Sequence, residues 1–440
     1  MSKLSKEEIK EKFPNRWSRI SHAAKDKTTV FNSLLCHINI ETLKEAFDSL
    51  DANKAVGTDG ISKKEYGKNL EANLEALVAR IHIGSYKPQT KKEILIPKAN
   101  GKTRPIAISC FEDKLIEWVI GKVLSCMYEP IFIRNSFGFR ENKSPHDAIK
   151  AVYRSLENNE RPNVVEIDFA SFFNSISHRK LMKILSKRMN DNRFKGLIGR
   201  FLKIGTIKQS GELEYSKVGT PQGSIMSPIL ANIFLNEVLD QWFVQCYASK
   251  SNIIVRYADD AIFFFENEDI AKNFVEQLFE RIKRYDLELN EDKTNIIRFE
   301  RSKQNTFNFL GFTFYWGKRF GGIEQPLKLK TRKDSLHKKI QEFDQWIKSC
   351  RNKMKLKEIW KLVIAKLKGH YNYYGYDVNR TKLCFFYFKV IGSLYKWLNR
   401  RSQKRSFNWK RLKRILEANN IPTPPVTTEL RHLIRGWAYV

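Results

Sequence analysis

Two adjacent acids, Asp259 and Asp260, lie within the apolar stretch Ile253–Phe265. The β-branched and aromatic residues on either side predict two buried strands joined by a tight turn over Tyr257–Asp260. Because neighbouring side chains of a straight strand point to opposite faces, the turn is where both carboxylates can reach one site. Two carboxylates about 4 Å apart repel by roughly 4 kcal/mol at an effective dielectric of 20, and Mg²⁺ is a cation suited to relieve this repulsion. A charged hairpin tip in solvent is the alternative interpretation of the same pattern.

A third acid, Asp168, stands near the end of a second apolar run, Val164–Phe169. This run predicts a strand that turns into a helix reaching Leu185. Sites in open sheets assemble where strands end, so Asp168 is a candidate site residue. A helix N-cap is the alternative role for an aspartate at this position.

Cations surround the tip of a predicted hairpin over residues 92–107, whose turn is Asn100–Gly101. Lys98, Lys102 and Arg104 fall around this tip. Arginine offers a planar fork of donors and lysine a point charge, so such a finger can clamp phosphates. A solvated hairpin tip fits the stretch equally well.

A loop rich in Gly and Pro, Gly219–Pro228, follows a second predicted hairpin over 206–218 and precedes an apolar helix over 229–242. Its glycines allow the backbone to approach a ligand closely. Gln222 is its one side-chain amide, able both to donate and to accept hydrogen bonds. A plain connection from strand to helix is the alternative.

The last quarter of the chain is far more basic than the rest. Residues 326–440 hold 28 Lys and Arg against 7 Asp and Glu, so they carry +21 of the total charge of +31. Residues 321–333 are predicted to be a linker, and apolar residues then recur at helical spacing from Leu336 to Leu367. Rings between cations around Gly369–Gly375 suit stacking on unpaired bases and contact with phosphates. An ordinary helical core with a solvated basic face explains the apolar stripes but not the charge, which favours a nucleic-acid partner.

The composition is that of a folded protein, with 42% hydrophobic and 12% aromatic residues in a chain long enough for two or three domains. The six cysteines form no Cys-x-x-Cys pair, which indicates reduced thiols in a cytosolic protein and not a zinc site. The first residues lack the apolar core of a signal peptide, and no run of 18 apolar residues predicts a membrane span. We therefore expect a cytoplasmic protein without a membrane partner; the sequence leaves the oligomeric state open.

Taken in chain order, these segments resemble a reverse transcriptase of the bacterial group II intron type. The resemblance covers about residues 42–401. Tyr-x-Asp-Asp alone would be a weak signal, whereas seven motifs in the family's order are a strong one. The seven motifs are Ile-Pro-Lys98-Ala-Asn-Gly-Lys-Thr-Arg104-Pro, Ser-Phe-Gly-Phe-Arg140, Asp168-Phe-Ala-Ser-Phe-Phe173, Gly-Thr-Pro-Gln222-Gly-Ser, Tyr257-Ala-Asp-Asp260, Leu-Asn290-Glu-Asp-Lys293-Thr and Phe-Leu-Gly311-Phe.

The resemblance implies an α+β fold of the right-hand polymerase kind, and the predicted alternation of helices with strand pairs agrees with it. Fingers and palm with an antiparallel sheet would span residues 41–320, after an N-terminal extension over 1–40. A basic helical thumb, or domain X, would span 321–405, and a basic tail 406–440.

The resemblance also implies a metal site. Asp168, Asp259 and Asp260 would hold two Mg²⁺ ions, for which Mn²⁺ could substitute. The backbone carbonyl of Phe169 would be a further ligand. Lys293 would protonate the leaving pyrophosphate, which makes it the fourth catalytic residue expected beside the three acids.

Five more residues would bind the incoming nucleotide. Phe173 matches the steric gate, a ring under the sugar that excludes a 2′-hydroxyl. Gln222 would flank the nucleotide, and the triphosphate would contact Lys98 and Arg104. Arg140, from an early motif, is also expected at the substrate.

The expected activity is therefore synthesis of DNA from dNTPs on an RNA template, an intron or a structured non-coding RNA, starting from a DNA or RNA primer. Splicing maturase activity for a group II intron is expected beside it. The alternatives are a free-standing reverse transcriptase in antiphage defence or DNA repair, and a non-catalytic maturase that only binds RNA. No segment rich in His and Cys follows residue 401, so an endonuclease module is not expected.

Overall fold

The computed structural model describes residues 15–97, 103–156, 161–215, 217–249, 251–301, 304–317, 326–401 and 408–425. The chain divides into two compact units, each of which gathers segments that are remote in sequence. The predicted domain limits at residues 40, 320 and 405 do not coincide with the limits of these units, and they stay a prediction. Unit 1 comprises Met1–Ser144, Val165–Phe263 and Asp269–Asn295; unit 2 comprises Pro145–Val164, Phe264–Glu268 and Ile296–Val440.

A long helix, α6 (Phe111–Tyr128), forms the centre of the helical part of unit 1. Apolar residues recur all around it, so it is buried on every side, against α2 (Arg16–Ala24), α3 (Ile40–Ser49) and α11 (Ser227–Leu235) among others. The other helices assigned mainly to unit 1 are η1 (Leu34–His37), α4 (Lys63–Tyr66), η2 (Gly67–Asn69), α5 (Leu70–His82), η3 (Glu129–Ile131), α8 (Phe172–Ser175), α9 (His178–Ser186), α10 (Asn192–Leu202), η4 (Asn236–Asp240), α12 (Gln241–Cys246), α13 (Glu268–Arg284) and η5 (Glu291–Lys293).

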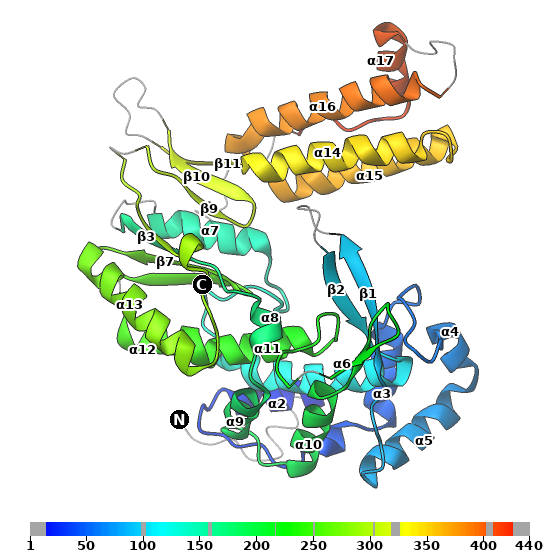
Figure 1. Cartoon of the computed structure of the whole chain (residues 1–440), viewed down its shortest axis with the longest axis vertical. Helices are drawn as coiled ribbons and strands as arrows, with labels where there is room; N and C mark the ends of the chain where they lie inside the picture. Colours follow the sequence, from blue (N-terminus) through cyan, green and yellow to red (C-terminus); the bar gives the residue numbers. More distant parts are fainter. Residues whose placement is uncertain are drawn as a thin grey trace. The chain divides into compact units, whose positions relative to one another are not determined.

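A four-stranded sheet with the order β2-β1-β4-β5 contains both predicted hairpins of the first half of the chain. β1 (Lys91–Pro97) and β2 (Thr103–Ile108) pair antiparallel (Figure 1). β4 (Thr206–Ile207) pairs parallel with β1 and antiparallel with β5 (Leu213–Glu214). Residues 98–102 lie outside the described residues, and with them the turn Asn100–Gly101 and the two lysines of the tip.

A second four-stranded sheet has the order β6-β7-β3-β8 and carries the acids. β6 (Ile253–Tyr257) and β7 (Asp260–Phe265) confirm the predicted hairpin, and β3 (Asn163–Ile167) confirms the strand before Asp168. β8 is Asn295–Arg298. The limit between the two units falls within β3, β7 and β8, each of which continues from one unit into the other.

Unit 2 contains a three-stranded antiparallel sheet with the order β11-β10-β9. Its strands are β9 (Phe307–Phe309), β10 (Phe312–Trp316) and β11 (Leu327–Thr331). The prediction of a linker over 321–333 is therefore wrong for the residues of β11. Leucine and lysine alternate there, which buries the leucines on one face of the sheet.

Three long helices make up most of unit 2. α14 (Lys333–Cys350), α15 (Leu356–Tyr374) and α16 (Arg380–Leu398) run alongside one another (Figure 1). The apolar residues of the predicted helical stripe, such as Leu336, Phe343 and Ile347, are buried, which confirms a helical C-terminal region. The unit also holds α7 (Pro145–Leu156), η6 (Asp377–Asn379) and α17 (Trp409–Ala418), the last within the segment predicted as a tail. Among the described residues, none of the helices has the length and apolarity that crossing a membrane requires.

Candidate active site

The turn between β6 and β7 places Asp259 and Asp260 at the end of a buried hairpin. Ala258 has a φ of 58°, in the left-handed region, which helps to reverse the chain over so few residues. Asp259 is partly buried, whereas Asp260 is exposed and begins β7. A left-handed alanine costs of the order of 1 kcal/mol or more, so contacts around the turn must hold it in place.

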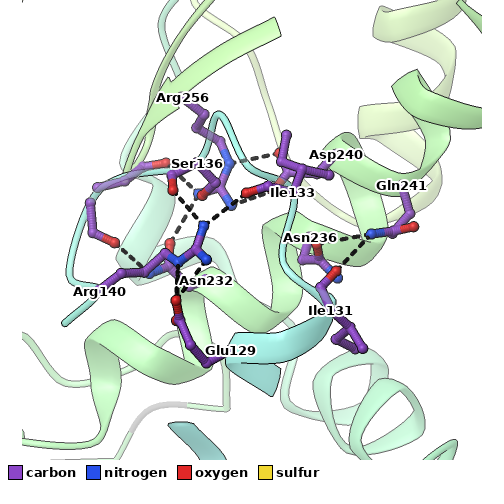
Figure 2. Close-up of polar contacts among 12 residues, drawn as sticks. Glu129, Ile131, Ile133, Ser136, Arg140, Asn232, Asn236, Asp240, Gln241 and Arg256 are labelled. Carbon is purple, nitrogen blue, oxygen red and sulfur yellow. Dashed lines mark hydrogen bonds and ion pairs between the residues drawn. The ribbon is translucent and has the colours of Figure 1, made fainter. Parts of the chain in front are cut away.

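Arg256, two residues before Ala258, holds the turn (Figure 2). Its guanidinium is fully buried and donates to the carbonyl oxygen of Ala258 at 2.9 Å and to Asn232 Oδ1 at 3.0 Å. It also donates to both carboxylate oxygens of Asp240, at 2.7 and 2.5 Å. Asp240 ends the π-helix η4, which interrupts the helix predicted over 229–242. π-Helical turns are rare in proteins as a whole, and those that occur are often found at functional sites. This one carries Asp240, the acid that pairs with Arg256.

A backbone segment around Gly138 packs against the same turn. A Cβ added at Gly138 would lie 2.2 Å from the backbone nitrogen of Ala258, so only glycine fits there. Asn232 Nδ2 donates to the carbonyl of Gly138 at 2.6 Å, and the backbone N–H of Phe137 donates to the carbonyl of Arg256 at 2.8 Å. Asn232 thus connects Gly138 with Arg256 across the turn.

Arg140, which was expected to bind substrate, is engaged within the protein. Its Nε and Nη2 donate to the carboxylate of Glu129 at 2.7 to 3.1 Å (Figure 2). Its Nη1 donates to the carbonyls of Ile133 and Ser136 at 2.8 and 2.5 Å, and only 5% of the side chain is exposed. These contacts fold the loop that carries Gly138. The structure therefore gives Arg140 a role in positioning this loop, and the expected substrate contact stays a prediction.

Asp168, just after β3, meets Lys293, which lies 125 residues further along the chain. Lys293 Nζ donates to Asp168 Oδ2 at 2.8 Å, and the two side chains are 63% and 40% exposed. The backbones are joined as well, because the N–H of Asn290 donates to the carbonyl of Asp168 at 2.7 Å and Phe169 bridges to Leu289. The motif of Asp168 and the motif of Lys293 therefore lie next to each other in the site.

The ionisation of Asp259 shows which charges lie around it. Burial raises the pKa of its carboxyl above the ordinary value, and the negative charge of Asp168 raises the pKa further. The charges of Arg104, on β2, and of Arg256 lower this pKa. Since charges act on a carboxyl only over short distances, Asp168, Asp259 and Arg104 share one electrostatic neighbourhood. Their catalytic roles stay a prediction.

Phe173 and Gln222 belong to one connected group of backbone contacts. The N–H of Thr220 donates to the carbonyl of Phe173 at 2.7 Å, and the N–H of Ala107 donates to the carbonyl of Gln222 at 2.6 Å. Gly223, at a φ of +106°, leaves no room for a Cβ against Ala107, which explains a glycine in this loop. Gln222 lines a cavity of about 290 Å³, large enough for part of a nucleotide.

Within the ranges that the structure describes, no three Asp, Glu, His or Cys side chains are already arranged as metal ligands. Two observations fit a cation at this place. The carboxylate of Asp168 is already paired with an ammonium, that of Lys293. Asp259 is a partly buried carboxyl whose pKa is raised by burial and by the neighbouring acid, and a cation would lower this pKa. Carboxylate oxygens are the ligands that Mg²⁺ prefers, so the residues present fit this metal.

The buried ion pairs around the site were not predicted from the sequence. Arg256 and Asp240 are one; the other is Lys91 of β1 with Glu117 of α6, at 2.7 Å and with neither side chain exposed. Glu117 also accepts from the backbone N–H of Ile225 at 2.9 Å, which ties the β1–β2 hairpin to the end of the Gln222 loop. The sequence does contain one sign of the Arg256–Asp240 pair. Arg256 is a charged residue inside the apolar run Ile-Ile-Val-Arg256-Tyr, which indicates a buried partner of opposite charge.

Residues 96–314 match a family of known proteins described as reverse transcriptase (RNA-dependent DNA polymerase). The matched span includes the three acids, Lys293, Phe173 and Gln222. It also includes Arg256 and Asp240.

The chain is 34% identical over 196 residues to protein YkfC of Escherichia coli (strain K12), which covers 44% of this chain and 51% of that protein. It is 35% identical over 203 residues to the group II intron-encoded protein LtrA of Lactococcus lactis subsp. cremoris, over 46% of this chain and 33% of that protein. The chain thus matches about half or less of the length of these relatives. Among solved structures, apo telomerase from Candida tropicalis truncated from its C-terminal domain aligns with a TM-score of 0.44 and 17% identity, over 56% of this chain and 55% of that chain.

Proposed function

The chain belongs, through residues 96–314, to the reverse transcriptases of the group II intron type, and on that premise we propose that it synthesises DNA on an RNA template. The observation that carries the proposal is the shared neighbourhood of Asp168 and Asp259. One acid follows β3 and the other lies in the β6–β7 turn, and the charge of the first acts on the ionisation of the second. Nucleotidyl transfer requires carboxylates gathered in this way.

Asp168, Asp259 and Asp260 would hold two Mg²⁺ ions, with the carbonyl of Phe169 as a further ligand. Bound there, Mg²⁺ supplies positive charge where the attacking 3′-hydroxyl and the transferred phosphate develop negative charge. Lys293, already hydrogen-bonded to Asp168, would donate a proton to the leaving pyrophosphate.

In this proposal, the nucleotide is positioned by Phe173, by Gln222 in the loop before α11, and by cations of the β1–β2 hairpin. Arg104 is exposed on β2 and its charge reaches Asp259, so it is available to the triphosphate. Lys98 is proposed beside it, in the part of the hairpin outside the described residues. Phe173 would exclude the 2′-hydroxyl, and Gln222 would flank the base or sugar from its cavity.

For the RNA partner we propose the intron that encodes the protein, with splicing maturase activity and with a DNA or RNA primer for synthesis. One of the relatives is described as encoded by a group II intron. The charge of +21 over residues 326–440 supplies the attraction for RNA, in a unit whose helices present Lys and Arg beside exposed rings such as Phe388 and Trp409. We propose that residues 321–405 act as the thumb.

All six cysteines are free. Reduced thiols suit the cytoplasm, which we propose as the compartment.

Primer extension tests the proposal. The full chain, an RNA template with an annealed DNA primer, dNTPs and Mg²⁺ should yield full-length cDNA, and Asp168→Asn should yield none. Asp286→Asn is the matched control, because Asp286 is an aspartate of unit 1 that is 57% exposed and pairs with Lys180. No synthesis by the wild-type protein, or equal synthesis by Asp168→Asn, would contradict the proposal. Sequencing of RNA that co-purifies with the protein tests the intron partner separately.

A further inference from the structure

A basic hollow lies beside α9 and α10, helices that pack on each other in unit 1 (Figure 1). Its volume is about 840 Å³. Met182 and Leu202 line it together with the ring of Tyr215, and we call these three side chains the apolar floor. Five cations surround it: Arg179, Lys195, Arg200, Lys203 and Lys217.

These five cations are unneutralised. No Asp or Glu lines the hollow, and within the described ranges none of the five forms an ion pair. Neighbouring lysines of the same helical region do have acidic partners: Lys180 pairs with Asp286 at 2.7 Å, and Lys187 pairs with Glu237. The hollow therefore concentrates positive charge that an anion outside the protein can neutralise.

Two glycines of α10 leave room for a ligand to approach the helix backbone at the hollow. Gly196 and Gly199 line it, and a Cβ added at either would meet nothing within 4 Å. Glycine is less favourable than alanine inside a helix, and neither position has a steric reason for it. Both glycines lower the stability of the helix. A ligand that lies close to α10 here, such as a phosphodiester strand, would explain why glycine stands at these positions.

The hollow adjoins the loop of Gln222. Leu202 lines both the hollow and the 290 Å³ cavity that contains Gln222. His178, at the start of α9, contacts the carbonyl of Gly219 through Nε2 at 2.6 Å and lines the hollow as well. A strand that lies in the hollow can thus continue towards the nucleotide site without leaving unit 1.

We propose that the hollow binds the phosphodiester backbone of a single RNA strand, at nucleotides outside the catalytic site. The proposal rests on the proposed function, because it takes the bound strand to be RNA. Five unpaired cations match consecutive phosphates, and the apolar floor accepts the sugar and base surfaces that phosphates leave uncovered. A protein partner with acidic residues would also have to bury large apolar side chains, and the three side chains of the apolar floor offer little surface for this.

Salt-dependent binding tests it. The full-length variant Lys195→Gln/Arg200→Gln/Lys203→Gln removes three charges from the hollow. The slope of log K against log salt for a long single-stranded RNA should fall in magnitude by about 2, and the affinity at 0.1 M salt by about 100-fold, if each cation contacts one phosphate. The control Lys54→Gln/Lys64→Gln/Lys68→Gln removes the same charge from exposed positions of unit 1 and should change the slope by less.

Extension of a short primer on a template too short to reach the hollow should stay at the wild-type rate. An unchanged slope in the hollow variant, or an equal change in the control, overturns the proposal. Because binding is measured without synthesis, a chain that proves inactive as a polymerase leaves this result readable.

A second variant, Gly196→Ala/Gly199→Ala, separates binding from folding. Alanine should raise the melting temperature, since it favours the helix, and should weaken RNA binding, since it narrows the hollow. Equal or tighter RNA binding by this more stable variant would show that the strand does not approach α10.

Discussion

Arg256 and Asp240 are joined by two hydrogen bonds, of 2.7 and 2.5 Å, and neither side chain is exposed to solvent. Breaking a buried pair by removing one partner costs about 3–5 kcal/mol, whereas apolar residues in place of both are often neutral. Arg256 also donates to the carbonyl of Ala258, the left-handed residue before Asp259. The pair therefore contributes to the stability of unit 1 and to the position of the acids at once.

These two contributions can be separated. Asp240→Asn leaves a buried guanidinium without a counter-charge, so the free energy of unfolding should fall by about 3–5 kcal/mol in urea titrations. The double variant Arg256→Met/Asp240→Leu should recover most of this stability but not the hydrogen bond to Ala258, and primer extension should stay low. Wild-type extension by the stable double variant would mean that Arg256 does not position the turn.

Replacing both Asp259 and Asp260 with Ala should abolish primer extension on RNA. Binding of the same RNA, measured by filter retention, should stay within about twofold, because removing two negative charges adds no clash and removes no phosphate contact. Continued synthesis would show that the β6–β7 turn is not the catalytic site. Loss of binding together with synthesis would point instead to an unfolded unit, which circular dichroism would detect.

Phe173 is predicted to select the sugar of the nucleotide. Its carbonyl is fixed by Thr220 and its ring packs edge-on against Phe139, with ring centres 6.5 Å apart. Phe173→Ala should leave that backbone contact in place and raise incorporation of ribonucleotides relative to deoxyribonucleotides, by tenfold or more if the ring alone excludes the hydroxyl, as roughly 1.4 kcal/mol of discrimination would give. An unaltered ratio in competition assays would remove the gate role.

His370 makes the stability of unit 2 depend on pH. Burial, with a smaller effect from the charge of Lys339, lowers its pKa to about 4, and its ring stacks on Phe386 with centres 3.7 Å apart. The unfolded chain binds a proton near pH 6.5 and the folded one only near pH 4, so stability is complete above pH 6.5 and is lost as the pH falls towards 4. His370→Gln lacks this proton site. The loss of unfolding free energy between pH 7 and pH 4 should therefore be about 3 kcal/mol smaller in the variant than in the wild type, and parallel curves would contradict it.

The predicted elements that proved correct depend on local pattern. Alternation and turn residues indicated both hairpins of the first half, and the apolar run before Asp168 indicated β3. What the pattern could not show is which charges become buried together. Asp240 is one of several polar residues in the predicted helix over 229–242, and only the π-helical turn and a strand sixteen residues away make it the partner of Arg256.

The contacts of Arg140 within the protein could not be predicted for a similar reason. An arginine in a motif could bind substrate or a nearby acid, and its hydrogen bonds to Glu129 and to two carbonyls become visible only when the loop is folded. The linker predicted over 321–333 failed because a short edge strand such as β11 gains its stability from pairing with β10, which the composition of the segment does not reveal.

Lys293 has two possible functions, and substitution by arginine tells them apart. In the structure its ammonium neutralises Asp168 at 2.8 Å, which an arginine could also do. A proton donor must give up its proton within the reaction, and arginine, which stays protonated in proteins, does so poorly. If Lys293 protonates pyrophosphate, Lys293→Arg should lower kcat about 10²-fold, within the usual range for general acids. A fully active Lys293→Arg beside an inactive Lys293→Ala would instead show that the residue serves only as the counter-charge of Asp168.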